Sequence, residues 1–139
     1  MVRFGKNVSY DHTCSIARHV EDSVYTPGGK ALILDQLLCT SPGKGHMTRI
    51  LRRYLRRLPP SITEVWTVAH PYRCGDGLHW KCIIRYARWL HRLGFRFQDR
   101  SAFFSRLREY ISRGEEEIWY GAIQDVGWMV LTREGSQYR

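Results

Sequence analysis

Residues 31–58, ALILDQLLCTSPGKGHMTRILRRYLRRL, predict a strand, a glycine turn and a helix in direct succession. Residues 31–39 are almost all apolar, which is typical of a strand that is covered on both faces. The turn SPGKG follows at 41–45, and residues 46–58 then repeat apolar side chains at helical spacing. Such a junction directs backbone N–H groups and the positive end of a helix dipole at one point, which suits a phosphate or pyrophosphate.

The turn is neither of the two common phosphate-binding loops. A P-loop has four residues between its first glycine and a following Gly-Lys-Ser/Thr, and the Rossmann fingerprint has a third glycine. A plain solvated turn between a strand and a helix is therefore the alternative interpretation.

The remaining elements follow in a simple order. Pro59-Pro60 end the first helix, and a second strand is expected at residues 64–70. Later elements are two helices, at 80–93 and 101–112, and two strands, at 118–123 and 128–132. Before the central strand, a helix is expected at 15–24. This pattern predicts an α/β fold of the α+β type with a mixed sheet.

Size and composition indicate one folded domain over residues 1–139, because 43% of the residues are hydrophobic and 13% are aromatic. No run approaches the roughly 20 apolar residues that span a bilayer, and the first residues lack the apolar core of a signal peptide. We therefore expect a cytoplasmic protein that has no membrane partner.

Four cysteines are scattered along the chain and are expected to be thiols in that compartment. His70, Cys74, His79 and Cys82 have a spacing that matches no common zinc finger, so no metal site is predicted.

Charge is the other strong signal. The chain has 22 Lys and Arg against 13 Asp and Glu, a formal net charge of +9. The helix at 46–58 carries arginines and no acid on the side opposite its apolar stripe. These are Arg49, Arg52, Arg53, Arg56 and Arg57. This face is either a solvated surface or the contact surface for nucleic acid or another polyanion.

Residues 31–131 resemble the GCN5-related N-acetyltransferase (GNAT) family. Its acyl-CoA turn reads Gln/Arg-x-x-Gly-x-Gly/Ala, and residues 40–45 lie over it. Its second motif reads roughly Ala-x-x-x-Tyr-x-x-x-Gly-Phe, and ARWLHRLGF at 87–95 lies over it. Thr40 stands where the family often has Gln or Arg, and Leu90 stands where it often has a catalytic tyrosine.

The resemblance implies a central mixed sheet with a splayed pair of strands, flanked by helices, and acetyl-CoA as co-substrate. Thirty residues before the central strand are too few for the family's usual elements, so a reduced amino-terminal half is expected. Strand backbone would pair with the pantetheine arm at Leu37, Leu38 and Cys39. Backbone N–H groups would hold the pyrophosphate at Gly43, Lys44, Gly45, His46 and Met47.

Three side chains are candidates for proton transfer. Family members commonly place a general base on the central strand, where this chain has Asp35, although such a carboxylate can also be paired at an edge. His70 ends the second strand as a base or hydrogen-bond donor, or as a structural histidine. Tyr86 lies one helical turn before Leu90 and is the candidate general acid.

The resulting prediction is an enzyme: an acyl-CoA-dependent N-acyltransferase, specifically an N-acetyltransferase, acting on an amine of a protein or nucleic acid. Residues 75–94 are also loosely similar to the second motif of the Mom-type phage DNA-modification proteins, which makes a DNA base-modifying enzyme of the same fold an alternative. A non-enzymatic basic protein that binds nucleic acid or a host protein is the third interpretation.

Overall fold

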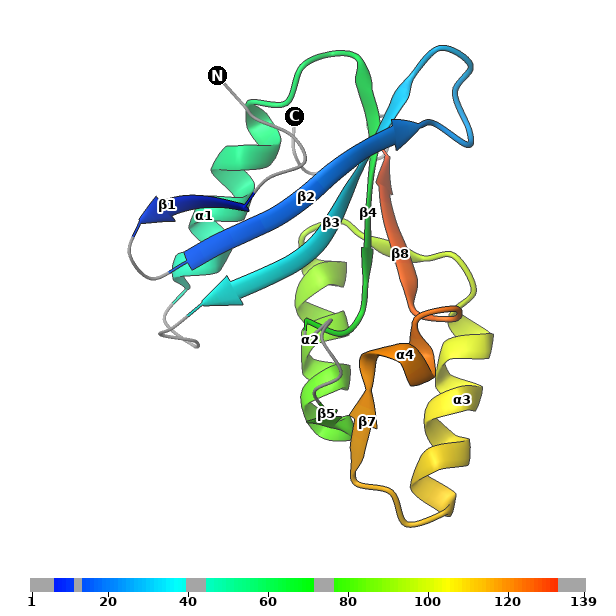
Figure 1. The fold of residues 1–139 in the computed structure, drawn as a ribbon. Helices are drawn as coiled ribbons and strands as arrows, with labels where there is room; N and C mark the ends of the chain where they lie inside the picture. Colours follow the sequence, from blue (N-terminus) through cyan, green and yellow to red (C-terminus); the bar gives the residue numbers. More distant parts are fainter. Residues whose placement is uncertain (1–6, 12–13, 40–44, 72–76, 133–139) are drawn as a thin grey trace. The chain divides into compact units, whose positions relative to one another are not determined.

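The computed structural model describes residues 7–11, 14–39, 45–71 and 77–132 of the chain (Figure 1). Its elements are β1 (Asn7–Asp11), β2 (Cys14–Asp22), β3 (Lys30–Cys39), α1 (His46–Arg56), β4 (Ile62–Val68), β5 (Gly77–His79), α2 (Trp80–Arg92), β6 (Arg96–Phe97), α3 (Arg100–Ser112), β7 (Glu117–Trp119), α4 (Tyr120–Ile123) and β8 (Trp128–Thr132). The expected α/β class with a mixed sheet is confirmed.

The described chain divides into two compact units. Residues up to Trp66 form the first unit together with Leu131 and Thr132, and Thr67–Val130 form the second. Strands β4 and β8 therefore contribute residues to both units.

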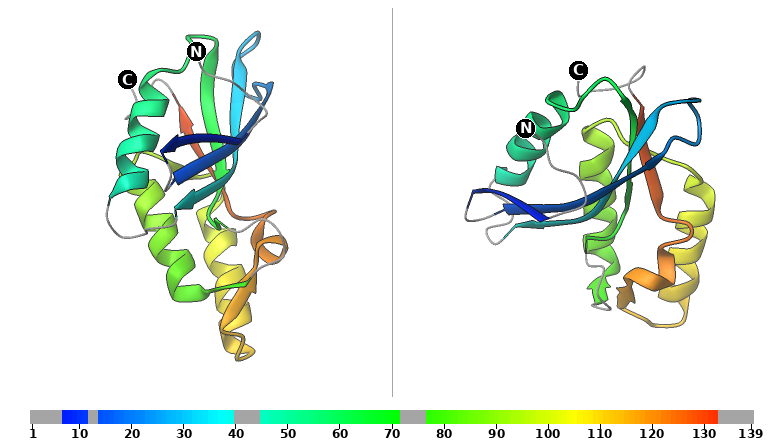
Figure 2. Two further views of the ribbon diagram at one scale, coloured as in Figure 1. Left: turned by 60° about the vertical axis from the view of Figure 1, so that its left-hand side comes forward. Right: turned by 45° about the horizontal axis from the view of Figure 1, so that its top comes forward.

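In the first unit the strands lie in the order β1-β2-β3-β4. Strand β2 is antiparallel to both β1 and β3. Strands β3 and β4 begin side by side, because Lys30 N donates to Ser61 O over 2.8 Å, so these two strands run parallel. Helix α1 connects them and packs on β2 and β3 (Figures 1 and 2). Its apolar stripe is buried in this core through Ile50, Leu51, Tyr54 and Leu55.

The expectation of a helix at 15–24 is wrong, since strand β2 occupies this segment and pairs with β3 along its whole length. Cys14, Ile16 and Arg18 are buried at alternate positions, which is strand periodicity. The cation of Arg18 occupies a position where the alternation calls for an apolar residue, and its guanidinium lies 5.4 Å from the centre of the Tyr54 ring. This buried arginine hides the period of two in the sequence.

Strand β3 contains a β-bulge at Asp35. Ala17 is opposite Gln36 while Arg18 is opposite Leu34, so β3 has one residue more than β2 at this point. Bulges bend a strand and redirect side chains, and they are frequent beside active sites.

In the second unit the end of β4, then β8, then β6 lie side by side, and β6 and β8 are antiparallel. Strands β5 and β7 form a separate two-stranded sheet. Helix α2 ends at Arg92 and is followed by Gly94, whose φ of 108° lets the N–H groups of Gly94 and Phe95 donate to the carbonyls of His91 and Leu90.

The expectation of a strand at 118–123 is wrong in its second half. Strand β7 ends at Trp119, opposite Gly77 of β5, and the chain then turns into α4. Tyr120 and Ile123 are buried from this helix at a spacing of three, which is also compatible with helical packing.

Candidate functional site

The junction of β3 and α1 is the first part of the candidate site. Gly45 is the N-cap of α1 in the left-handed conformation, with φ of 75°, and its carbonyl accepts from Arg49 N over 3.1 Å. The N–H groups of His46 and Met47 belong to the first turn, which has no intrahelical acceptor for them. No acidic residue lies in this turn. Gly43 and Lys44 lie outside the described residues.

Arg49 belongs to this junction rather than to the outer arginine face. Its Nη2 donates to His46 Nδ1 over 2.7 Å, and a Cβ atom on Gly45 would lie 3.3 Å from its Nη1. The guanidinium therefore adds a positive charge where the sequence predicts an anion. The other predicted arginines of α1 are exposed, and none pairs with an acid in the described part of the chain. They are Arg52, Arg53, Arg56 and Arg57.

The predicted pantetheine segment is the end of β3. Its last three residues, Leu37–Cys39, pair with Cys14–Ile16 of β2. Leu37 is buried opposite Ile16, whereas Leu38 is 40% exposed.

Asp35 lies in a cluster that the sequence did not predict. Its Oδ2 is 2.6 Å from His19 Nδ1, and His19 Nε2 is 2.6 Å from Glu21 Oε2. Burial of the imidazole lowers the pKa of His19, but the hydrogen bonds and charges of the two carboxylates outweigh this and raise it overall. His19 and Glu21 are two residues apart, so they lie on the same face of a strand. The sequence contains this signal, but the expectation of a helix at 15–24 places the two side chains on different faces.

His70 is buried in the second unit. Its Nε2 lies 2.8 Å from the carbonyl oxygen of Ile118, and its ring meets Tyr120 edge-on at 5.8 Å. Burial lowers the pKa of His70, and the hydrogen bond to Ile118 only partly offsets this. Nε2–H donates to this carbonyl, and the lowered pKa favours the neutral imidazole at neutral pH.

Tyr86 lies on α2 with its ring 5.5 Å from Trp89. Burial raises the pKa of the Tyr86 phenol, and the neighbouring Tyr120 adds to this effect. The phenol therefore stays protonated at neutral pH. Tyr120 interacts with both His70 and Tyr86, so two of the three predicted catalytic side chains share one neighbour in the second unit, while Asp35 belongs to the first.

Other sequence expectations bear on cofactors and membranes. Among the described residues, no group of three or more His, Cys, Asp or Glu side chains is arranged to hold a metal ion, and Cys74 lies outside them. Cys14 and Cys82 are thiols rather than disulfides. No helix in the described ranges is both long and apolar enough to cross a membrane.

Comparison of the chain with protein-family models, curated proteins and solved structures finds no match. The functional argument therefore depends on the geometry and chemistry of the residues themselves.

Proposed function

We propose that the protein is an acyl-CoA-dependent N-acyltransferase that transfers an acetyl group to an amine on a protein or nucleic acid. The observation that carries this proposal is the β3–α1 junction, where a left-handed glycine, the first turn of a helix and Arg49 come together. The parallel pair of β3 and β4 around α1 supports it, because the family that the sequence resembles has this strand–turn–helix–strand arrangement.

Binding would use backbone groups and one cation. The first-turn N–H groups of α1 would donate to the pyrophosphate of CoA, and Arg49 would add a charge-assisted hydrogen bond. The backbone at the end of β3 would pair with the pantetheine amides as an added strand does.

Acetyl-CoA supplies a thioester, whose carbonyl carbon the amine attacks while the carbon–sulfur bond breaks. His70 is the better candidate for the base, because its lowered pKa favours the neutral imidazole that a base requires. Asp35 already bonds His19, so we assign it a role in holding that cluster. Tyr86 would donate its hydroxyl proton to the departing thiolate.

Isothermal titration with acetyl-CoA tests the proposal. Wild-type protein should bind, and Gly45→Val should remove measurable binding, because a side chain there meets Arg49 and disfavours the left-handed backbone. Gly28→Val is the matched control. Gly28 has nearly the same φ, 79°, in the turn before β3, and nothing lies within 4 Å of its added Cβ.

Both substitutions carry a similar backbone strain of about 1–2 kcal/mol. Loss of binding in Gly45→Val alone would therefore identify the junction as the site. An absence of wild-type binding at millimolar acetyl-CoA would end the acyltransferase proposal and leave a basic binding protein.

A further inference from the structure

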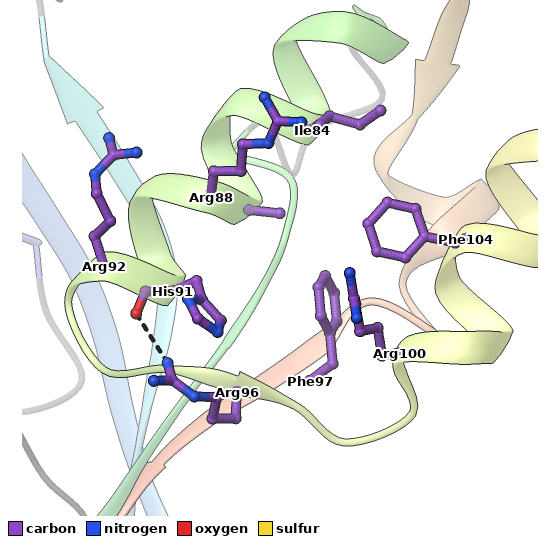
Figure 3. A pocket seen from close by; sticks show the side chains of 9 residues that line it. Ile84, Arg88, His91, Arg92, Arg96, Phe97, Arg100 and Phe104 are labelled. Atoms are coloured by element: carbon purple, nitrogen blue, oxygen red, sulfur yellow. Dashed lines mark hydrogen bonds between the residues drawn. The ribbon is translucent and has the colours of Figure 1, made fainter.

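The second unit contains an arginine-lined hollow of about 770 Å³ that no part of the proposed function uses (Figure 3). It lies between α2, β6 and α3, and its cations are Arg88, Arg92, Arg96 and Arg100. No acidic residue lines it, and apart from His91 the remaining lining is apolar. We call this feature the arginine hollow.

The charges of the arginine hollow are not neutralised within the described chain. The ion pairs of the described residues include none of its four guanidinium groups. Arg96 Nη1 is held by the carbonyls of His91 and Phe95 at 2.9 and 2.8 Å, which fixes this cation at the end of α2. Four like charges around one concave surface repel each other and attract an anion.

Two aromatic rings give the arginine hollow an apolar surface among the cations. Phe97 and Phe104 project into the space between α2 and α3, with ring centres 5.9 Å apart (Figure 3). Both rings are partly exposed. The Phe97 ring packs against the buried ring of Phe103, with the two ring centres 4.5 Å apart. Arg100 lies 5.4 Å from the Phe104 centre. Exposed rings beside arginines are the features on which nucleic-acid bases stack.

The lining continues along α3. A second hollow of about 570 Å³ shares Arg100 and Phe104 with the first and extends to Ser101 and Arg108. A drug-sized ligand fills a pocket of roughly 300–1,000 Å³, so two neighbouring hollows that share Arg100 and Phe104 offer contacts for a ligand longer than one nucleotide.

We propose that the second unit binds single-stranded nucleic acid in the arginine hollow, with phosphates on the arginines and bases against Phe97 and Phe104. A duplex keeps its bases stacked and paired, so it could contact the arginines but not the rings. This inference goes beyond the proposed acyltransferase function and does not depend on acetyl-CoA.

Fluorescence anisotropy with a labelled 12-nucleotide oligo-dT tests the charge component. Arg88→Gln/Arg92→Gln removes two lining cations, and Lys81→Gln/Arg85→Gln removes two exposed cations at the same spacing on α2 but outside the lining. The first variant should weaken binding and reduce the log–log salt slope by about 1.4, at about 0.7 per phosphate on a single strand. The control should leave the slope near the wild-type value.

Phe104→Leu tests the stacking component, because it removes the aromatic face and keeps an apolar side chain. Binding of oligo-dT should weaken about 5-fold or more, while an abasic strand of the same length should bind the variant and wild type equally. An RNA strand of the same length shows whether the sugar matters.

Three results would overturn the inference. An equal loss of affinity in the two double variants would mean a diffuse charge effect. Tighter binding of duplex DNA than of the single strand would make the rings irrelevant. Displacement of oligo-dT by micromolar adenosine 3′,5′-bisphosphate would indicate a mononucleotide pocket. None of these measurements contains CoA, so failure here is distinct from failure of the acyltransferase proposal.

Discussion

Replacement of Asp35 by Asn should reduce the pH dependence of folding stability. In the folded protein His19 lies between Asp35 and Glu21, and its pKa is raised above the ordinary value near 6.5. Below that value His19 is protonated in both states, and the full stabilisation by the carboxylates is present. As the pH rises through the higher folded pKa, His19 loses its charge and the stabilisation is lost.

The expected change in the free energy of unfolding depends on how exposed the side chains of the cluster are. The His19 side chain is 38% exposed, so solvent screens the interaction, whereas Asp35 is only 16% exposed. A partly screened pair of this kind contributes about 0.5–1 kcal/mol. Glu21 is 62% exposed and should contribute less than Asp35. The wild-type free energy of unfolding should therefore fall by about this amount between pH 5.5 and 8.5, in addition to the protein's general trend.

Urea unfolding of wild type and Asp35→Asn across this pH range measures the difference. In Asp35→Asn, the part of the fall in the free energy of unfolding with pH that His19 causes should shrink by at least half. In Glu21→Gln it should shrink by a smaller share. Asp22→Asn is the control, because Asp22 is on the same strand but pairs with Lys30. If Asp35→Asn and Asp22→Asn give the same slope as wild type, His19 is not held by this carboxylate and the argument is refuted.

Three further outcomes are expected. Gly127→Ala should lower the free energy of unfolding by about 1–3 kcal/mol in urea titrations, because its Cβ would lie 2.8 Å from the Ile123 carbonyl oxygen, whereas Gly121→Ala, with open space around it, should not destabilise the fold. Tyr86→Phe should keep the fold and CoA affinity but reduce turnover by ~10²-fold or more, and wild-type turnover would exclude this general acid. If α1 contacts nucleic acid, Arg52→Gln/Arg53→Gln should reduce the log–log salt slope on duplex DNA by about 1.8, and an unchanged slope would indicate a solvated surface.

Much of the fold could be predicted because the spacing of apolar residues and the positions of helix-terminating residues indicated the same elements. The elements now seen as β3, α1, β4, α2, α3 and β8 were predicted with ends within about two residues. Pro59-Pro60 follow the end of α1 and Gly94 follows the end of α2, and both are local signals that a helix does not continue. Strand β2 was missed because Arg18 is buried on its apolar side, and no local rule places a charge there.

Only the local part of the junction could be predicted. The glycine turn and the start of α1 at His46 depend on a few successive residues, whereas the left-handed conformation of Gly45 is known from the structure alone. The cluster of His19 with Asp35 and the contacts of Tyr120 with His70 join residues far apart in the chain, and they depend on strand register and tertiary packing. The arginine hollow likewise combines two helices and a short strand.

The bulge at Asp35 adds one residue to β3 and so shifts which sequence positions lie on each face of the strand. Leu34 and Leu37 are both buried although they are three positions apart, because the extra residue changes the phase of the side-chain alternation. Deleting Asp35 would restore a regular ladder in the same register, with Gln36 still opposite Ala17 and Leu37 still buried opposite Ile16. A deletion elsewhere in β3 would instead exchange the two faces of the residues beyond it, so the bulge is the position in this strand where loss of a residue should be tolerated best.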